Sequence, residues 1–288
     1  MRSKVSRLTL TNPSELRALL AQFDVDLKHS LGQNFLISKP IIDKIVSLAD
    51  CNCEDNVLEV GPGAGTLTVA MLERGAKVAS IEKDKSLYQV LKHTTSPWAQ
   101  NFSLIEGDAL EIDEQALVTQ PNKFIANLPY NIAATLILDY LKNIASLKSS
   151  TVMVQKEVAD RICAKPGTKL YGAYTVKLSL FASVTGSFFV GRNNFLPAPR
   201  VDSKVVRLDR IDEKKDRPLQ TACKIADSLF YNRRKTVLNS AIAYFGKEHA
   251  KELREWLVRC GVDEHVRAET LQSGVFETLA INAPSFMA

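Results

Sequence analysis

The stretch that decides the fold is residues 58–66, which read LEVGPGAGT. Residues 56–60 form an apolar run that predicts a buried strand, and an amphipathic helix is predicted to begin at Leu67. The three glycines stand at alternate positions, where they remove every side chain that would hold the backbone away from a ligand. A dinucleotide fingerprint needs two residues between its second and third glycines, but Thr66 stands where that third glycine would fall. The turn therefore favours a different ligand at the end of a central strand, and a plain strand-to-helix connection is the alternative.

From residue 56 onward, apolar runs alternate with helical stretches, which is typical of an α/β fold with a mostly parallel sheet and helices on both faces. Seven runs predict strands, at residues 56–60, 77–81, 102–106, 123–126, 151–155, 184–190 and 205–208. After a charged linker, four helices are predicted near residues 219–230, 234–245, 247–260 and 269–279. We therefore expect a sheet-containing domain over residues 1–210 and a small all-α domain over residues 211–288.

The composition is that of an ordinary globular protein, with 45% hydrophobic and 24% charged residues among 288. Because no apolar run reaches the length of a bilayer-spanning helix and the first ten residues lack the apolar core of a secretory signal, we expect a cytoplasmic protein. An organelle transit peptide is the alternative, since no acidic residue precedes Glu15. The five cysteines and four histidines show no ligand spacing, so we expect free thiols and no metal site.

Positive charge is concentrated in residues 151–210, which hold 10 Lys and Arg against 4 Asp and Glu. This excess predicts a surface that contacts nucleic-acid phosphates, and a solvated basic face is the alternative. Arg233, Arg234 and Lys235 are expected to begin a C-terminal helix. Cations at a helix start oppose the helix dipole, which favours a phosphate contact as the reason for their presence.

Two acidic residues follow predicted strands and are candidates for binding a nucleoside. Glu82 stands at the end of the second strand, 17 residues after Gly65, where a carboxylate can accept hydrogen bonds from two vicinal ribose hydroxyls. Asp108 follows the third strand and could accept a hydrogen bond from an adenine amino group. An acid after a strand is often only a turn residue, so the case for Asp108 depends on Glu82 and the glycine turn.

The fourth predicted strand runs into Asn127, Leu128, Pro129 and Tyr130. Proline fixes its own φ and restricts the residue before it, so this turn is stiff. It can direct the Asn127 side-chain oxygen and the Leu128 carbonyl at an exocyclic amine, and their dipoles would stabilise positive charge that develops on that nitrogen. Tyr130 offers a ring on which an extruded base can stack. The alternative is a strand-to-helix turn in which these residues only cap and pack.

Residues 195–199, an aromatic followed by two prolines, predict a rigid lip near the same site. Phe195 is the candidate for stacking on the opposite face of the flipped base, and Arg200 is a candidate contact to RNA. A rigid surface loop is the alternative.

Taken together, seven motifs resemble the ribosomal RNA adenine dimethyltransferase family. They are GQNFL at residues 32–36, ExGxGxG at 59–65, Glu82, GDA at 107–109, NLPYN at 127–131, FxPxPxVDS at 195–203 and FYNRRKT at 230–236. The match runs in order from about residue 28 to 240 and is highly specific as a set.

The resemblance implies a Rossmann-like methyltransferase fold that uses S-adenosyl-L-methionine and releases S-adenosyl-L-homocysteine. It implies N6,N6-dimethylation of two adjacent adenosines in the 3′-terminal hairpin loop of small-subunit rRNA, within an immature small ribosomal subunit. We expect a monomer that needs neither metal nor membrane. Two alternatives stay open: an enzyme of the erythromycin-resistance type that acts on large-subunit rRNA, and a non-catalytic RNA-binding assembly or transcription factor of the same fold.

The resemblance also implies roles for individual residues. Asn34 and Leu36 would contact the methionine part of the cofactor, and Gly61, with Gly63 in the same turn, would lie beneath it. Glu82 would bind the ribose and Asp108 the adenine. Asn127 would serve both the cofactor and the target amine.

Overall fold

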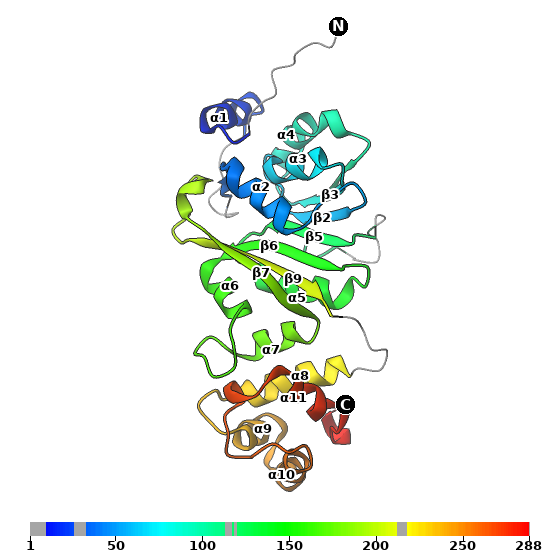
Figure 1. Cartoon of the computed structure of the whole chain (residues 1–288), viewed down its shortest axis with the longest axis vertical. Coiled ribbons are helices and arrows are strands. Elements are labelled where there is room, and N and C mark those ends of the chain that lie inside the picture. Colours follow the sequence, from blue (N-terminus) through cyan, green and yellow to red (C-terminus); the bar gives the residue numbers. More distant parts are fainter. Residues whose placement is uncertain (1–9, 26–32, 113–116, 118–119, 212–217, 288) are drawn as a thin grey trace. The chain divides into compact units, whose positions relative to one another are not determined.

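The computed structural model describes residues 10–25, 33–112, 117, 120–211 and 218–287 (Figure 1). The chain divides into two compact units, one of Met1–Ala159 with Val184–Asp209 and one of Asp160–Ser183 with Arg210–Ala288. The division near residue 210 lies where the linker was expected. Residues 160–183, which we expected in the sheet-containing domain, group with the C-terminal helices, because α7 (Ala173–Ser179) packs on α8 (Leu219–Phe230).

A seven-stranded sheet with the order β4-β3-β2-β5-β6-β9-β7 confirms the predicted fold class. Its strands are β2 (Asn56–Val60), β3 (Lys77–Glu82), β4 (Phe102–Glu106), β5 (Lys123–Asn127), β6 (Ser149–Gln155), β7 (Ala182–Val190) and β9 (Ser203–Arg210). The five strands from β4 to β6 in this order are parallel, and β9 pairs antiparallel with β6. The glycine turn therefore follows a central strand, and the ends of β3, β4 and β5 lie at the same edge.

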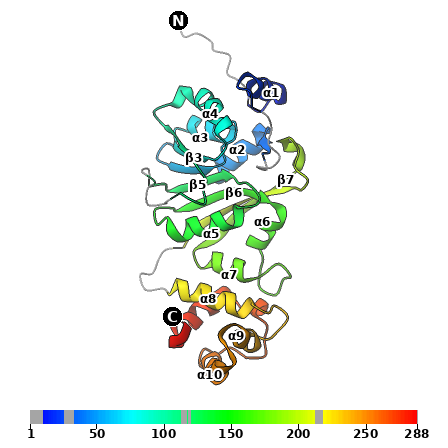
Figure 2. The ribbon, with the colours of Figure 1, turned by 180° about the vertical axis from the view of Figure 1, so that it is seen from behind.

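Helices cover both faces of this sheet, as Figures 1 and 2 show for α2, α3 and α4 on one face and α5 on the other. The helices here are α1 (Pro13–Gln22), α2 (Lys39–Leu48), α3 (Thr66–Glu73), α4 (Tyr88–Thr94), α5 (Ala133–Asn143) and α6 (Lys156–Ile162). Neighbouring residues of a strand point to opposite faces. Accordingly, Ile125 packs with α2 and α3, while the ring of Phe124 contacts Tyr140 of α5 with centroids 5.1 Å apart.

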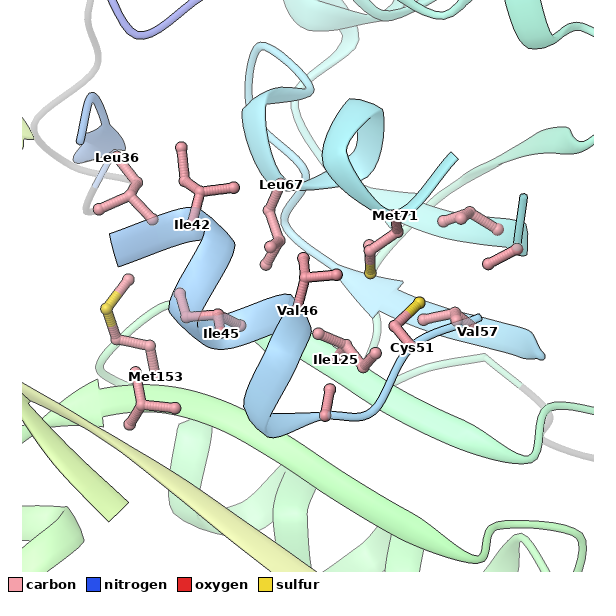
Figure 3. Close-up of a cluster of buried hydrophobic side chains, with 14 of the residues drawn as sticks. Leu36, Ile42, Ile45, Val46, Cys51, Val57, Leu67, Met71, Ile125 and Met153 are labelled. Atoms are coloured by element: carbon pink, nitrogen blue, oxygen red, sulfur yellow. The ribbon is translucent and has the colours of Figure 1, made fainter. Parts of the chain in front are cut away.

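The core beneath α2 and α3 joins the glycine turn to the sheet (Figure 3). Ile45 and Val46 of α2 and Met71 of α3 pack against Ile125 and Met153 of the strands. All five side chains are at most 2% exposed. Burial of such side chains contributes about 1.5–3 kcal/mol each to the stability of the fold. The helix that follows the glycine turn is therefore held firmly against the sheet.

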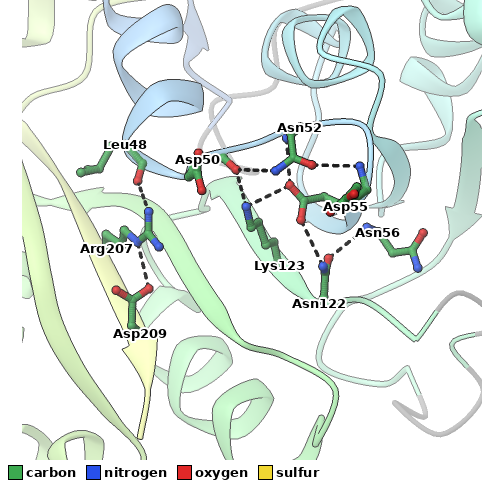
Figure 4. A network of polar contacts seen from close by, with 10 residues as sticks. Leu48, Asp50, Asn52, Asp55, Asn56, Asn122, Lys123, Arg207 and Asp209 are labelled. Atoms are coloured by element: carbon green, nitrogen blue, oxygen red, sulfur yellow. Dashed lines mark hydrogen bonds and ion pairs between the residues drawn. The ribbon is translucent and has the colours of Figure 1, made fainter.

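A polar network joins β2 and β5 at their amino ends (Figure 4). Lys123 Nζ lies 2.9 Å from Asp55 Oδ2, and both side chains are largely buried. Asn122 donates to Asp55 Oδ1 at 3.0 Å and accepts from the Asn56 backbone amide at 2.9 Å. These polar groups satisfy one another's hydrogen-bonding and charge requirements at the edge of the sheet opposite the glycine turn. We therefore infer that the network stabilises the fold and takes no part in the site.

The second unit is helical, with α9 (Val237–Phe245), α10 (Ala250–Arg259) and α11 (Ser273–Ile281) in addition to α7 and α8 (Figure 1). Its core contains Trp256, whose indole donates to the Leu279 carbonyl at 3.0 Å, and Phe276, which stacks on Phe230. The sequence did not predict α7, because residues 173–179 include β-branched and aromatic residues with weak helix propensity. No helix among the described residues could cross a membrane.

Helix α9 begins later than predicted. Thr236 is its N-cap and accepts from the Asn239 amide at 3.3 Å, so the first helical residue is Val237. The expectation that Arg233, Arg234 and Lys235 begin this helix is therefore wrong, since all three lie in the turn before it. The dipole argument for their function does not apply to that turn.

Candidate functional site

A cavity of about 180 Å³ lies at the carboxyl ends of the parallel strands. That is roughly ten times the space that one water molecule requires, so the cavity can admit a small ligand. The structure brings together in its lining Asn34, Leu36, Gly61, Gly63, Glu82, Asp108, Asn127, Leu128, Pro129 and Tyr130, all of them predicted site residues. The cavity thus joins the turns after β2, β3, β4 and β5 with the segment that holds β1 (Phe35–Leu36).

The glycine turn requires glycine on conformational and on steric grounds. Gly61 and Gly63 adopt φ values of +67° and +61°, which are strained for other residues. A Cβ atom at Gly63 would lie 2.9 Å from the Phe35 ring. A Cβ atom at Gly61 would lie 3.4 Å from Pro129 Cδ, so the turns after β2 and β5 approach each other closely.

Glu82 lines the cavity and is 7% exposed. Its Oε2 accepts from the Gly63 amide at 3.3 Å, and its Oε1 accepts from the Asp84 amide at 2.8 Å. Burial raises the pKa of this carboxyl above its ordinary value, although both hydrogen bonds oppose the shift. Gln33, for which the sequence suggested no role, donates to Asp84 Oδ2 at 2.7 Å and so ties the β1 segment to the end of β3.

Asp108 is held by a residue that the sequence reading missed. Lys83 Nζ lies 2.6 Å from Asp108 Oδ2, and the Leu110 amide donates to Oδ1 at 3.1 Å. The hydrogen bond from Lys83 is the largest cause that lowers the pKa of Asp108. Lys83 directly follows Glu82 in the sequence, and that position was the only feature that could have indicated its role.

Asn127 ends β5 and faces the β1 segment. Its Nδ2 donates to the Asn34 carbonyl at 3.3 Å, which leaves Oδ1 as the acceptor end of the amide. The Leu128 amide donates to the Met153 carbonyl at 3.0 Å, so the peptide before the proline is held to β6. The Tyr130 hydroxyl lies 2.9 Å from Ser203 Oγ, which fixes the ring at the cavity wall.

Glu59, the acid of the glycine motif, is buried beneath the turn and is 1% exposed. The hydroxyls of Thr68 and Ser80 both donate to its Oε2 at 2.7 Å. Burial raises the pKa of Glu59 from 4.5 to about 7. The sequence identified the acid but not its two partners, which come from α3 and β3.

This burial predicts a pH-dependent stability. A carboxyl whose pKa is raised on folding binds its proton more tightly in the folded state, so stability is lost as the pH rises from about 4.5 to about 7. Replacing Glu59 with glutamine should remove that loss, and the variant should be more stable than the wild type above pH 7 by about 3 kcal/mol. Urea unfolding at pH 5 and pH 8 measures the difference.

The matched control is Glu54→Gln, because Glu54 is exposed and lies in the loop before β2. It should reproduce the wild-type pH dependence. The same dependence in the Glu59 variant would show that Glu59 does not contribute to it.

Phe195 does not lie where the sequence predicted. It belongs to β8 (Phe195–Leu196), which pairs antiparallel with β1, and it is 3% exposed within the core beneath α2 and α3. The cavity lining does not include Phe195 or the exposed Arg200. The ring is therefore not an exposed lip in this arrangement, because pairing with Leu36 turns it inward. A stacking role would require β8 to move.

Arg233 makes contacts within its own unit that the sequence did not predict. Its guanidinium donates to the carbonyls of Lys169 and Tyr171, the latter at 2.8 Å, and lies 3.4 Å from Glu269. These contacts join three segments of the second unit, although the Arg233 side chain remains 45% exposed, and its contact with RNA stays a prediction. Arg234 and Lys235 on the same turn are exposed.

The comparisons with known proteins agree with this geometry. The model of the ribosomal RNA adenine dimethylase family matches residues 25–282. The ribosomal RNA small subunit methyltransferase A of Lactococcus lactis is 35% identical over 94% of this chain and 95% of its own. The protein of the same name from Corynebacterium diphtheriae is 38% identical over 94% of each chain.

Solved structures show the same fold. A dimethyladenosine transferase from Plasmodium falciparum superposes with a TM-score of 0.74 at 26% identity, covering 85% of this chain and 95% of its own. The 23S rRNA methyltransferase ErmE gives a TM-score of 0.65 at 24% identity, over 86% and 99% of the two chains, and bears on the fold alone. Because the family model matches most of its length and these relatives are similar over 94% of it, the chain belongs to the ribosomal RNA adenine dimethylase family.

Proposed function

We propose that this protein transfers methyl groups from S-adenosyl-L-methionine to N6 of two adjacent adenosines in the 3′-terminal hairpin loop of small-subunit rRNA. The observation that carries the proposal is the single cavity in which the glycine turn, Glu82 and Asp108 meet the turn of residues 127–130. The small-subunit relatives, which match over 94% of the chain, favour this target over large-subunit rRNA.

The residues at the end of β2 and β3 fit the cofactor. Gly61 and Gly63, with their positive φ values, present backbone without side chains at the cavity wall, next to Asn34 and Leu36. The methionine part of the cofactor can therefore approach the backbone closely there. Glu82 presents a carboxylate that can accept from the ribose hydroxyls. Asp108 can accept from the adenine amine, in competition with Lys83 or alongside it. The bound cofactor supplies an electrophilic methyl group.

The turn after β5 acts on the target amine. Asn127 Oδ1 and the Leu128 carbonyl accept hydrogen bonds from the two N–H groups and direct the nitrogen lone pair into the cavity. Their dipoles stabilise the positive charge that the nitrogen gains during transfer. Tyr130, fixed by Ser203, offers a face on which the extruded base stacks. The chemistry requires no general base before methyl transfer and no metal.

Outside the cavity, RNA contacts are proposed for Arg200 in the first unit and for Arg234 and Lys235 in the second, because all three are exposed cations. Arg233 supports their turn. The proposed substrate is rRNA within an immature small subunit, and the protein is proposed to act on it as a cytoplasmic monomer.

Mapping the methylated nucleotides tests the proposal. Purified protein and labelled S-adenosyl-L-methionine are incubated with immature small subunits from cells that lack this modification. We expect label on two adjacent adenosines of the 3′-terminal hairpin. Label on free large-subunit RNA instead would support an enzyme of the erythromycin-resistance type. Cofactor binding without transfer to either RNA would support a non-catalytic factor.

A further inference from the structure

Two tyrosines of the second unit form an exposed aromatic pair. Tyr231, in the turn before α9, is 61% exposed, and Tyr244, in the last turn of α9, is 40% exposed. Their rings meet edge to face with centroids 5.5 Å apart. Single exposed apolar side chains are common on protein surfaces, but aromatic residues gathered together on a surface often mark a binding site.

The pair is backed by further rings. Tyr244 contacts Phe245 at 4.9 Å between centroids, and Phe245 contacts Phe286 at 5.6 Å. Phe286 in turn stacks on His249 at 3.9 Å. Phe245, Phe286 and His249 are half-buried, so they support Tyr244 from the side of the core.

The turn that carries Tyr231 is held in place. Arg233 bonds the carbonyls of Lys169 and Tyr171. The Asn232 amide donates to Ser240 Oγ at 2.9 Å, and the Lys235 amide donates to the Asn232 carbonyl at 2.8 Å. A fixed turn lowers the entropic cost of binding, because fewer conformations are lost when a ligand binds.

The same turn carries two exposed cations, Arg234 and Lys235. Within the described part of the chain, neither side chain has an ion pair or a hydrogen bond with another residue. Exposed aromatic faces beside exposed cations match the chemistry of single-stranded nucleic acid, in which bases stack and phosphates pair with positive charge. A surface that binds a protein partner would be expected to be more apolar and to carry fewer positive charges.

We infer that Tyr231 and Tyr244 form a stacking platform for an unpaired base of the substrate RNA, and that Arg234 and Lys235 bind the phosphates beside it. This inference rests on the proposed function for the nature of the substrate. The platform belongs to the second unit and shares no residue with the cavity lining, so its proposed contribution is affinity for RNA.

Binding of fluorescein-labelled oligoadenylate to the full-length protein, followed by anisotropy over a range of salt concentrations, tests the platform. Replacing both Tyr231 and Tyr244 with alanine should weaken binding about 10-fold or more and leave the salt slope unchanged, because stacking is not ionic. Replacing both Arg234 and Lys235 with glutamine should reduce the slope by about 1.4, since each phosphate contact to a single strand contributes about 0.7. Affinity for an RNA duplex of equal length should respond to the glutamine variant only.

Several variants keep the test decisive. Tyr231→Phe should bind as the wild type does, because it keeps the ring. Leucine at both tyrosine positions preserves apolar volume, so it should fold, as circular dichroism checks, and still lose the single strand. Ile281→Ala is the matched control, because Ile281 is 71% exposed on α11 of the same unit.

Tyrosine variants that bind the oligoadenylate as the wild type does, or that lose the duplex equally, would overturn the inference. Weaker binding to small subunits with unchanged oligoadenylate affinity would also overturn it and assign the surface to a ribosomal protein. Failure of the proposed function would appear differently, as wild-type protein that transfers no methyl group to small subunits.

Discussion

Replacing Asn127 with alanine is expected to lower the rate of methyl transfer by a factor of about 10²–10³, which corresponds to roughly 2.7–4 kcal/mol for one oriented dipole at a charged transition state. The side chain ends β5, and its amide is oriented by the bond from Nδ2 to the Asn34 carbonyl. Its Oδ1 is therefore preorganised before the target arrives. Single-turnover transfer to immature small subunits at saturating cofactor measures the effect directly.

The matched control is Asn193→Ala, because Asn193 is an exposed asparagine of the same unit that does not line the cavity. It should leave the rate unchanged, and thermal unfolding should show that both variants are folded. An Asn127→Ala protein with near-normal single-turnover rates would remove Asn127 from the transfer step. A lower cofactor affinity with an unchanged rate at saturation would restrict Asn127 to cofactor binding.

Replacing Glu82 with alanine is expected to weaken binding of S-adenosyl-L-methionine by about 10–100-fold, because hydrogen bonds to a charged acceptor contribute roughly 1.5–3 kcal/mol. The side chain also accepts from the Gly63 amide, so its loss releases the glycine turn that the cofactor contacts. Stability should not fall in proportion, since burial raises the pKa of Glu82 and disfavours its charged form. Isothermal titration calorimetry measures the affinity.

Glu106→Ala is the control for this variant. Glu106 is the register partner of Glu82 on β4, but its side chain is 53% exposed and does not line the cavity. Protonation of Glu82 should mimic the alanine variant. Because the Glu82 pKa is raised, wild-type affinity should begin to fall at a higher pH than it would with an ordinary glutamate. Equal cofactor affinity in the wild type and the Glu82 variant would contradict the ribose role.

Sequence alone determined the fold class and identified ten of the residues that line the cavity. The reason is local: hydrophobic periodicity defines the strands, and parallel strands place their carboxyl ends at one edge of the sheet. Once Asn56–Val60, Lys77–Glu82, Phe102–Glu106 and Lys123–Asn127 are parallel neighbours, the residues that follow them must meet. The spacing of the glycines then sets where a ligand can approach the backbone.

Only the tertiary structure decided what each side chain contacts there. It brought Lys83 to Asp108, brought Thr68 and Ser80 to Glu59, and buried Phe195 in the core. In the second unit, it brought Arg233 to the Tyr171 carbonyl. These outcomes depend on partners far away in the chain; Asn34 and Asn127, for example, are 93 positions apart in the sequence. Local propensity carries no information about such partners, because burial and hydrogen bonding are decided when the elements pack.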